Sequence, residues 1–149
     1  MHQFHYSGNK LHCEGVGLDS LVKKFGTPLY VYSQSTLEEH FHKLDRAMKP
    51  VDHLVCFAVK ANSNLSVLRT LANCGSGFDI VSTGELMRVI KAGGDPTRCV
   101  FAGAAKTAAE IEFAMKQHVY CFNAESEPEL GRINKVAARL KKSRPSPCA

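Results

Sequence analysis

The chain has 149 residues, of which 44% are hydrophobic and 22% charged, a composition typical of one soluble globular domain. The net charge of +5 comes from scattered basic residues, and the densest basic cluster, residues 139–144, contains no aromatic side chain, which argues against nucleic-acid binding. The six cysteines form no C-x-x-C pair, so no structural metal site is expected. No apolar run approaches the ~20 residues that cross a bilayer, and the first residues lack the pattern of a signal peptide. A cytoplasmic protein without a membrane partner is therefore expected.

The first 53 residues are predicted to form short, mixed elements. Phe4–Tyr6 and Leu29–Tyr32 are expected to be short strands. A short helix is expected at Leu18–Phe25, because Gly26 and Pro28 follow it, and a longer helix from Thr36 to about Met48. This opening is expected to be a lead-in that packs on a second module.

From residue 54 onward, one pattern repeats four times: an apolar run, a turn, and then an amphipathic stretch. The apolar runs begin 24, 21 and 20 residues apart, which leaves room for one helix and two short loops in each unit. Three helix starts have the serine or threonine and the glutamate of a capping box, at Ser82/Glu85, Thr107/Glu110 and Ser126/Glu129. The predicted strands are Leu54–Val59, Phe78–Val81, Cys99–Ala102 and Val119–Phe122.

Alternating strands and helices predict an α/β fold with a parallel sheet and right-handed crossovers. Such a sheet can stay open and doubly wound, or it can close into a (β/α)8 barrel. An open sheet would carry a glycine-rich phosphate loop after its first strand, but the turn here is Lys60-Ala-Asn-Ser-Asn64, without glycine. The barrel is therefore favoured, with about four of its eight units present and its chemistry at the carboxyl ends of the strands.

Lys60 ends the most apolar run of the chain, and it is the candidate catalytic residue. If the run is a strand buried on both faces, the amine lies in a place that is costly for an ammonium, and burial would favour the neutral, nucleophilic form. A neutral lysine amine forms Schiff bases with carbonyl compounds, including pyridoxal phosphate. The alternative from the strand alone is a lysine whose amine reaches solvent and has no chemical role.

The segments around Lys60 resemble the N-terminal part of the diaminopimelate decarboxylases, a branch of the pyridoxal-phosphate-dependent ornithine, diaminopimelate and arginine decarboxylases. The resemblance runs from about Gly26 to about Leu140. It rests on Phe57-Ala-Val-Lys-Ala-Asn62, Leu65 to Gly75, Gly77-Phe-Asp-Ile-Val-Ser82, Gly84-Glu-Leu86, Phe101-Ala-Gly-Ala-Ala-Lys-Thr107 and Cys121-Phe-Asn-Ala-Glu-Ser126.

The resemblance implies the N-terminal half of an alanine-racemase-like (β/α)8 barrel, with pyridoxal 5'-phosphate bound covalently to Lys60. It implies decarboxylation of meso-diaminopimelate to L-lysine, in lysine biosynthesis, by a full-length homodimer. Asp79 matches a family aspartate near the cofactor, and the alternative for it is a carboxylate that only organises the barrel. Glu85 and Glu125 are explained by helix starts. Lys106 is expected to be solvated.

The chain departs from the family pattern in two ways. Thr83 stands where glycine is usual, and Ala104-Ala105 stands where Val-Gly is usual, so the loop geometry near the cofactor could differ. The family's stacking histidine, phosphate-binding glycines and ring-nitrogen glutamate belong to later strands that this sequence does not contain.

The expected domains are therefore a lead-in at residues 1–35 that would pack on a C-terminal β-domain, a partial barrel at 36–141, and an atypical basic, proline-rich tail at 142–149. A truncated or frame-shifted gene would explain such a tail, and a half barrel is expected to be inactive alone. Two other hypotheses stay open: a non-catalytic relative that binds pyridoxal phosphate, and an inert barrel fragment.

Overall fold

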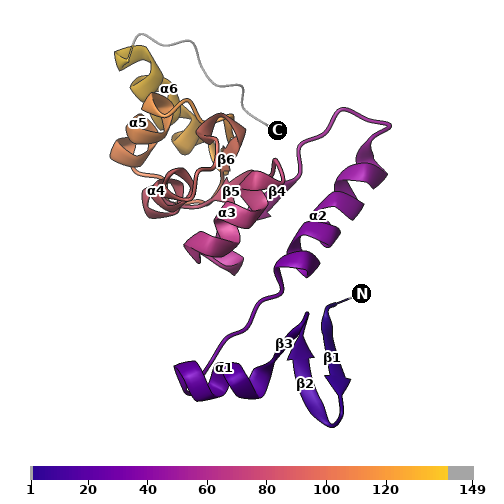
Figure 1. The fold of residues 1–149 in the computed structure, drawn as a ribbon. Helices are drawn as coiled ribbons and strands as arrows, with labels where there is room; N and C mark the ends of the chain where they lie inside the picture. The colour runs from indigo at the N-terminus through magenta and orange to yellow at the C-terminus, as the bar shows by residue number, and fades with distance from the viewer. Residues whose placement is uncertain (1, 141–149) are drawn as a thin grey trace.

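The computed structural model describes residues 2–140, which form a small antiparallel sheet and a larger parallel one. The small sheet and the first helix lie apart from the helices that surround the parallel sheet, and the long helix α2 lies between them (Figure 1). In chain order, the elements are β1 (Phe4–Ser7), β2 (Lys10–Cys13), β3 (Val16–Gly17), α1 (Leu18–Phe25), α2 (Gln34–Met48), β4 (Cys56–Ala58), η1 (Val59–Ala61), α3 (Leu65–Asn73), β5 (Gly77–Ile80), α4 (Thr83–Lys91), η2 (Pro96–Arg98), β6 (Cys99–Phe101), α5 (Ala108–Lys116), β7 (Cys121–Phe122) and α6 (Glu127–Arg139).

The parallel sheet has the order β4-β5-β6-β7, so each strand pairs with the next one along the chain. The register is uniform: Cys56 pairs with Gly77, Phe78 with Cys99, and Val100 with Cys121, each pair 21 residues apart. Helices α2, α3, α4 and α5 each contact the following helix. This regular succession of strand and helix confirms the predicted α/β repeat.

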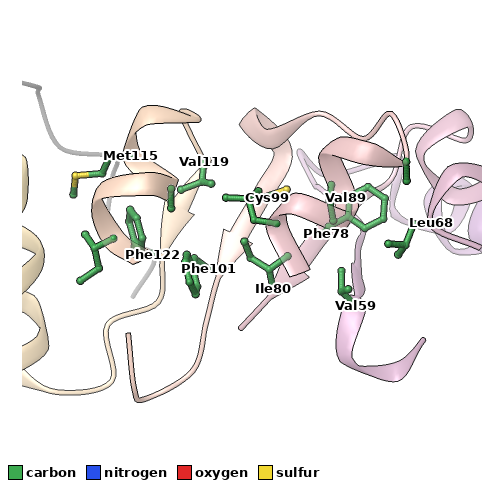
Figure 2. Packing of buried hydrophobic residues seen from close by; sticks show 14 of the residues in the cluster. Val59, Leu68, Phe78, Ile80, Val89, Cys99, Phe101, Met115, Val119 and Phe122 are labelled. Carbon is green, nitrogen blue, oxygen red and sulfur yellow. The ribbon is translucent and has the colours of Figure 1, made fainter. Parts of the chain in front are cut away.

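The core lies between the parallel sheet and its helices. Phe78 and Ile80 of β5 and Phe101 of β6 are fully buried, and Phe101 stacks on Phe122 of β7 with ring centroids 5.7 Å apart (Figure 2). Leu68, Leu86, Val89, Ile111, Ala114 and Ile133 contribute the helix side of this core. Asp79 and Val100, which alternate with these core positions on β5 and β6, are only partly buried and point to the other face of the sheet.

The helix starts follow from their capping side chains. Ser82, Thr107 and Ser126 each accept a hydrogen bond from the backbone N–H of the glutamate three residues on, as the sequence predicted. Only Thr107 and Glu110 form the reciprocal box, in which the Glu110 carboxylate also accepts the Thr107 N–H. Helix α2 begins two residues before its predicted start, because the capping residue is Ser33.

The N-terminal segment departs from the prediction in two places. The Phe4–Tyr6 strand is present within β1, but it pairs with β2, which the sequence analysis missed. The expected strand at Leu29–Tyr32 does not form: these residues have no regular structure and follow a cis Thr27–Pro28 peptide. Helix α1 has the predicted bounds and ends at Gly26, whose φ of 76° is easily adopted only without a Cβ.

The predicted strand Leu54–Val59 is also shorter than expected. Only Cys56–Ala58 pairs with β5, and Val59–Ala61 form a 3-10 turn. The residues of strand β4 are only partly buried, so the expectation of burial on both faces is wrong for it. The predicted tail at 142–149 lies outside the residues that the structure describes.

Candidate functional site

The turn after β4 places Lys60 at the carboxyl end of the parallel sheet. Val59 is fully buried and anchors the turn, while the side chain of Lys60 is 63% exposed. Two asparagines shape the segment that follows. The Asn62 side chain accepts the N–H of Asn64, and the Asn64 side chain caps helix α3 by accepting the N–H of Ser66. The polar run that the sequence predicted as a turn therefore ends the strand and starts the next helix.

Lys60 and Asp79 lie side by side, because the turn with Lys60 directly follows β4 and Asp79 lies in the adjacent strand β5. The Nζ of Lys60 is 4.0 Å from Oδ2 of Asp79, and the Asp79 side chain is 27% exposed. Asp79 pairs in register with Ala58, two residues before the lysine. The structure thus brings together the two residues that the sequence singled out. It contradicts the expectation that the Lys60 amine is buried, because the turn after β4 leaves the amine open to solvent.

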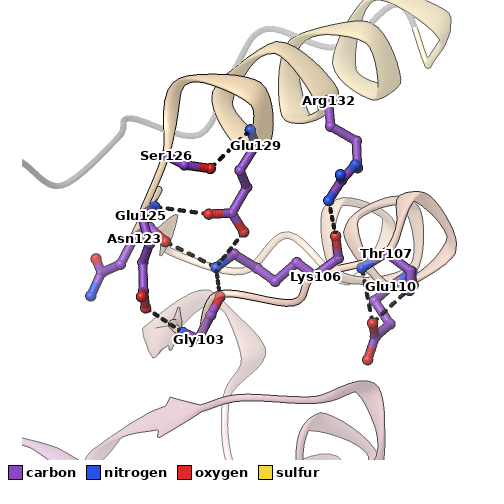
Figure 3. A network of polar contacts seen from close by, with 9 residues as sticks. All are labelled: Gly103, Lys106, Thr107, Glu110, Asn123, Glu125, Ser126, Glu129 and Arg132. Carbon is purple, nitrogen blue, oxygen red and sulfur yellow. Dashed lines mark hydrogen bonds and ion pairs between the residues drawn. The ribbon is translucent and has the colours of Figure 1, made fainter.

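A second lysine at the same end of the sheet behaves in the opposite way. The side chain of Lys106 is 1% exposed, so the prediction of a solvated lysine is wrong. Its Nζ donates hydrogen bonds to the carbonyls of Gly103 and Asn123, and it lies 2.9 Å from Oε1 of Glu129, whose side chain is 2% exposed (Figure 3). Burial is possible because a carboxylate and two carbonyls replace the water around the ammonium.

The buried carboxylate of Glu129 is held ionised by its surroundings. Burial alone would raise the pKa of Glu129, but the N–H of Glu125 and the ammonium of Lys106 more than offset it, so that the pKa lies below its ordinary value. Glu110 has a lowered pKa because the Thr107 N–H donates to its carboxylate, against the effect of burial. Both carboxylates are therefore charged at neutral pH.

Sequence reasoning missed the pairing of Lys106 with Glu129, although it identified the capping position of Glu129. One carboxylate oxygen of Glu129 accepts the N–H of Glu125, as a residue at a helix start can do, and the other faces Lys106. The only available signal was spacing, since both residues follow adjacent strands of the repeat. Spacing alone does not show which of the charged residues after a strand turns inward.

The departure at Thr83 leaves the local fold regular. Thr83 is the first residue of α4, and its N–H donates to Glu110 over 3.4 Å. Its hydroxyl is buried without a hydrogen-bond partner.

Among residues 2–140, no group of three or more His, Cys, Asp or Glu side chains could hold a metal ion, and no helix in this range is long and apolar enough to span a membrane.

A parallel sheet with a helix after each strand, and with an accessible lysine beside a carboxylate at the carboxyl ends of its strands, is the arrangement of the first units of a (β/α) barrel. The chain belongs to the pyridoxal-dependent decarboxylase family: the model of its pyridoxal binding domain matches residues 34–144.

Curated relatives of high similarity are diaminopimelate decarboxylases. The enzyme of Vibrio cholerae is 56% identical over 141 residues, which are 94% of this chain and 34% of that protein. The enzyme of Pseudomonas aeruginosa is 51% identical over 140 residues, again 94% of this chain and 34% of the relative. The chain therefore spans about a third of the length of the curated relatives it matches.

Solved structures agree with this assignment of fold. AQ1208 from Aquifex aeolicus superimposes with a TM-score of 0.90 at 42% identity, over 95% of this chain and 35% of that one. The diaminopimelate decarboxylase of M. jannaschii, solved with L-lysine, gives a TM-score of 0.89 at 31% identity, over 95% and 34% of the two chains. The predicted half barrel is thereby confirmed.

Proposed function

We propose that this chain carries the cofactor-anchoring third of a pyridoxal-phosphate-dependent decarboxylase that converts meso-diaminopimelate to L-lysine. Lys60 is the covalent anchor and Asp79 is the carboxylate beside it. The observation that carries the proposal is the exposed amine of Lys60, 4.0 Å from Asp79, in a domain of the pyridoxal-binding family. The choice of substrate rests on the 56% identity with the Vibrio cholerae diaminopimelate decarboxylase.

The residues present fit pyridoxal phosphate in its covalent part. An aldehyde can react only with a primary amine that it can reach, and the Lys60 side chain is 63% exposed at the carboxyl end of the parallel sheet. When bound, the cofactor would draw electrons from the substrate's α-carbon as carbon dioxide leaves. Lys60 provides the amine that holds the cofactor, and the partly buried Asp79 holds this amine by charge at the ends of β4 and β5.

The proposal also covers what the segment does by itself. Because the chain spans about a third of its relatives, we expect no turnover of diaminopimelate by the 149-residue chain alone. The complete enzyme is proposed to be a cytoplasmic homodimer that acts on a small amino acid. A chain that binds the cofactor without catalysis, and one that does not bind it, are the alternatives that the experiments separate.

The chain offers a matched control for the anchor. Lys10 and Asp19 also form a pair 4.0 Å apart, and the Lys10 side chain is 68% exposed, but this pair lies on the N-terminal segment away from the parallel sheet. The chain is incubated with pyridoxal phosphate, reduced with borohydride and digested, and the modified lysines are identified by mass spectrometry. We expect modification mainly at Lys60. It should be lost in Lys60→Ala and kept in Lys10→Ala. Equal modification of the two lysines would refute the anchor.

The substrate is tested in a chimera, in which this chain replaces the matching third of the Vibrio cholerae enzyme. We expect the chimera to release carbon dioxide from meso-diaminopimelate, and the Lys60→Ala chimera to be inactive while its melting temperature stays the same. A folded chimera without activity would contradict the proposed function.

A further inference from the structure

The buried ammonium of Lys106 joins two loops at the end of the sheet where Lys60 lies. Gly103, whose carbonyl accepts one hydrogen bond of Lys106, is in the loop that follows β6. Asn123, whose carbonyl accepts the other at 2.9 Å, is in the loop that follows β7. Glu129 adds the balancing charge from the first turn of α6. One side chain thus fixes two loops and a helix start.

Further contacts between the same loops make the connection rigid. The N–H of Gly103 donates to the carboxylate of Glu125 at 3.0 Å, and the guanidinium of Arg132 donates to the carbonyl of Lys106 at 2.7 Å (Figure 3). The loops after β6 and β7 are therefore linked in both directions, from side chain to backbone each time. Lys106 is the buried centre of these contacts, since its amine binds the Gly103 carbonyl in its own loop and, beyond that loop, the Asn123 carbonyl and the Glu129 carboxylate.

The linked loops also pack on the end of β5, which carries Asp79. Gly103 has a φ of 89°, and a Cβ at this position would lie 3.4 Å from Cβ of Val81, so that the glycine turn rests on the residue just after β5. The N–H of Ala102 donates to the carbonyl of Ile80 at 2.8 Å. A shift of the Gly103 turn would therefore move Ile80 and Val81, which directly follow Asp79.

Lys106 is not a second anchor for an aldehyde. Its amine is 1% exposed and fully occupied by two carbonyls and one carboxylate, whereas the Lys60 amine is open to solvent. A lone buried charge is costly, so Lys106 and Glu129 depend on each other. Burial of the pair could, however, serve stability alone, and the experiment has to distinguish this from a role in placing the loops.

We propose that Lys106 is a positioning residue, whose ammonium sets the loops after β6 and β7 and, through Gly103 and Val81, holds Asp79 beside Lys60. The last step, toward the cofactor anchor, rests on the proposed function. The placement of the loops does not rest on it.

Two variants separate positioning from stability. Lys106→Met leaves the Glu129 charge buried and unpaired, and we expect hydrogen exchange at the Gly103 amide to accelerate by about 100-fold, which is the scale of a broken buried pair. The double variant K106M/E129M replaces the pair by apolar side chains, which often restores stability. It keeps Glu125, the acceptor of the Gly103 amide, unchanged. The control is Lys116→Met, which breaks an exposed pair on α5 and should change neither readout.

The two readouts are exchange at Gly103 and the ratio of borohydride-trapped cofactor on Lys60 to that on Lys10. If Lys106 positions the loops, K106M/E129M regains the melting temperature of the parent chain, yet Gly103 still exchanges at least about tenfold faster and the Lys60 ratio stays low. Recovery of both readouts in the double variant, or unchanged exchange in both variants, would overturn the proposal. If the parent chain itself shows no preference for Lys60, the proposed function fails, and exchange at Gly103 still decides the placement of the loops.

Discussion

Gly77 is the position at which the smallest possible change should disturb the parallel sheet most. It begins β5, between β4 and β6. A Cβ at this position would lie 2.6 Å from the carbonyl oxygen of Arg98 and 2.7 Å from Sγ of Cys56. The φ of Gly77 is not in the left-handed region, so the conflict is one of space and not of backbone conformation.

The cost of Gly77→Ala follows from these contacts. Overpacking a tight core costs about 1–3 kcal/mol, and here one obstacle is a backbone carbonyl that cannot rotate away. The loss of freedom in the unfolded chain returns about 0.4–1 kcal/mol. We therefore expect a net loss of about 1–2 kcal/mol in the free energy of unfolding, which lowers the melting temperature by about 3–8 °C in a chain of this size.

Gly131→Ala is the matched control, with the opposite sign. Gly131 is inside helix α6, and a Cβ there would meet nothing within 4 Å. Alanine should stabilise this helix by about 0.5–1 kcal/mol. Urea unfolding of the three proteins, followed by circular dichroism, gives the free energies at equal slope. A Gly77→Ala variant as stable as the parent chain would refute the packing argument.

Two further predictions concern titratable groups. Burial raises the pKa of Cys99 to about 12, so iodoacetamide at pH 8 should label this thiol only after unfolding, and rapid labelling of the folded chain would contradict this. The free energy of unfolding should also fall as the pH rises from about 9 toward 12, because the thiol ionises at lower pH in the unfolded chain than in the folded one. Hydrogen bonds from the N–H of Ser35 and the hydroxyl of Ser33 lower the pKa of Glu14. The ionised Glu14 carboxylate therefore stabilises the fold above its ordinary pKa, and this contribution is lost when the pH falls and the carboxylate is protonated. Ser33→Ala removes one of these hydrogen bonds and the cap of α2, so it should lower the free energy of unfolding by about 1 kcal/mol and raise the pKa of Glu14. An NMR titration of Glu14 that is unchanged in this variant would contradict the role of the Ser33 hydrogen bond.

The repeat was predictable because its signals are local. The capping side chains at Ser82, Thr107 and Ser126 lie three residues from their partners, and the apolar stripes show the helical period directly in the sequence. The placement of Lys60 at the carboxyl end of a strand followed from the repeat, and Asp79 was singled out by the family resemblance, but their ion pair was not predicted.

The environments of the two lysines were not predictable, since both depend on distant residues. Lys60 is exposed because it lies in the 3-10 turn after β4 and not in the strand, which an apolar run does not reveal. Lys106 is buried because Glu129 and the Asn123 carbonyl contact its amine from the next repeat, together with the Gly103 carbonyl of its own loop. The hairpin of β1 and β2 did have a local signal, the Gly8-Asn9 turn, and was missed because its strands are short.

The uniform register of the parallel sheet has a consequence for folding. Each strand pairs with a segment 21 residues away, so no pairing in the sheet requires the closure of a long loop. Contacts of such short range favour rapid folding, and they can form in sequence while the chain leaves the ribosome, beginning with β4 and β5. The strands next to Lys60 and Asp79 would then be the first of the sheet to pair, before β6 and β7 emerge from the ribosome.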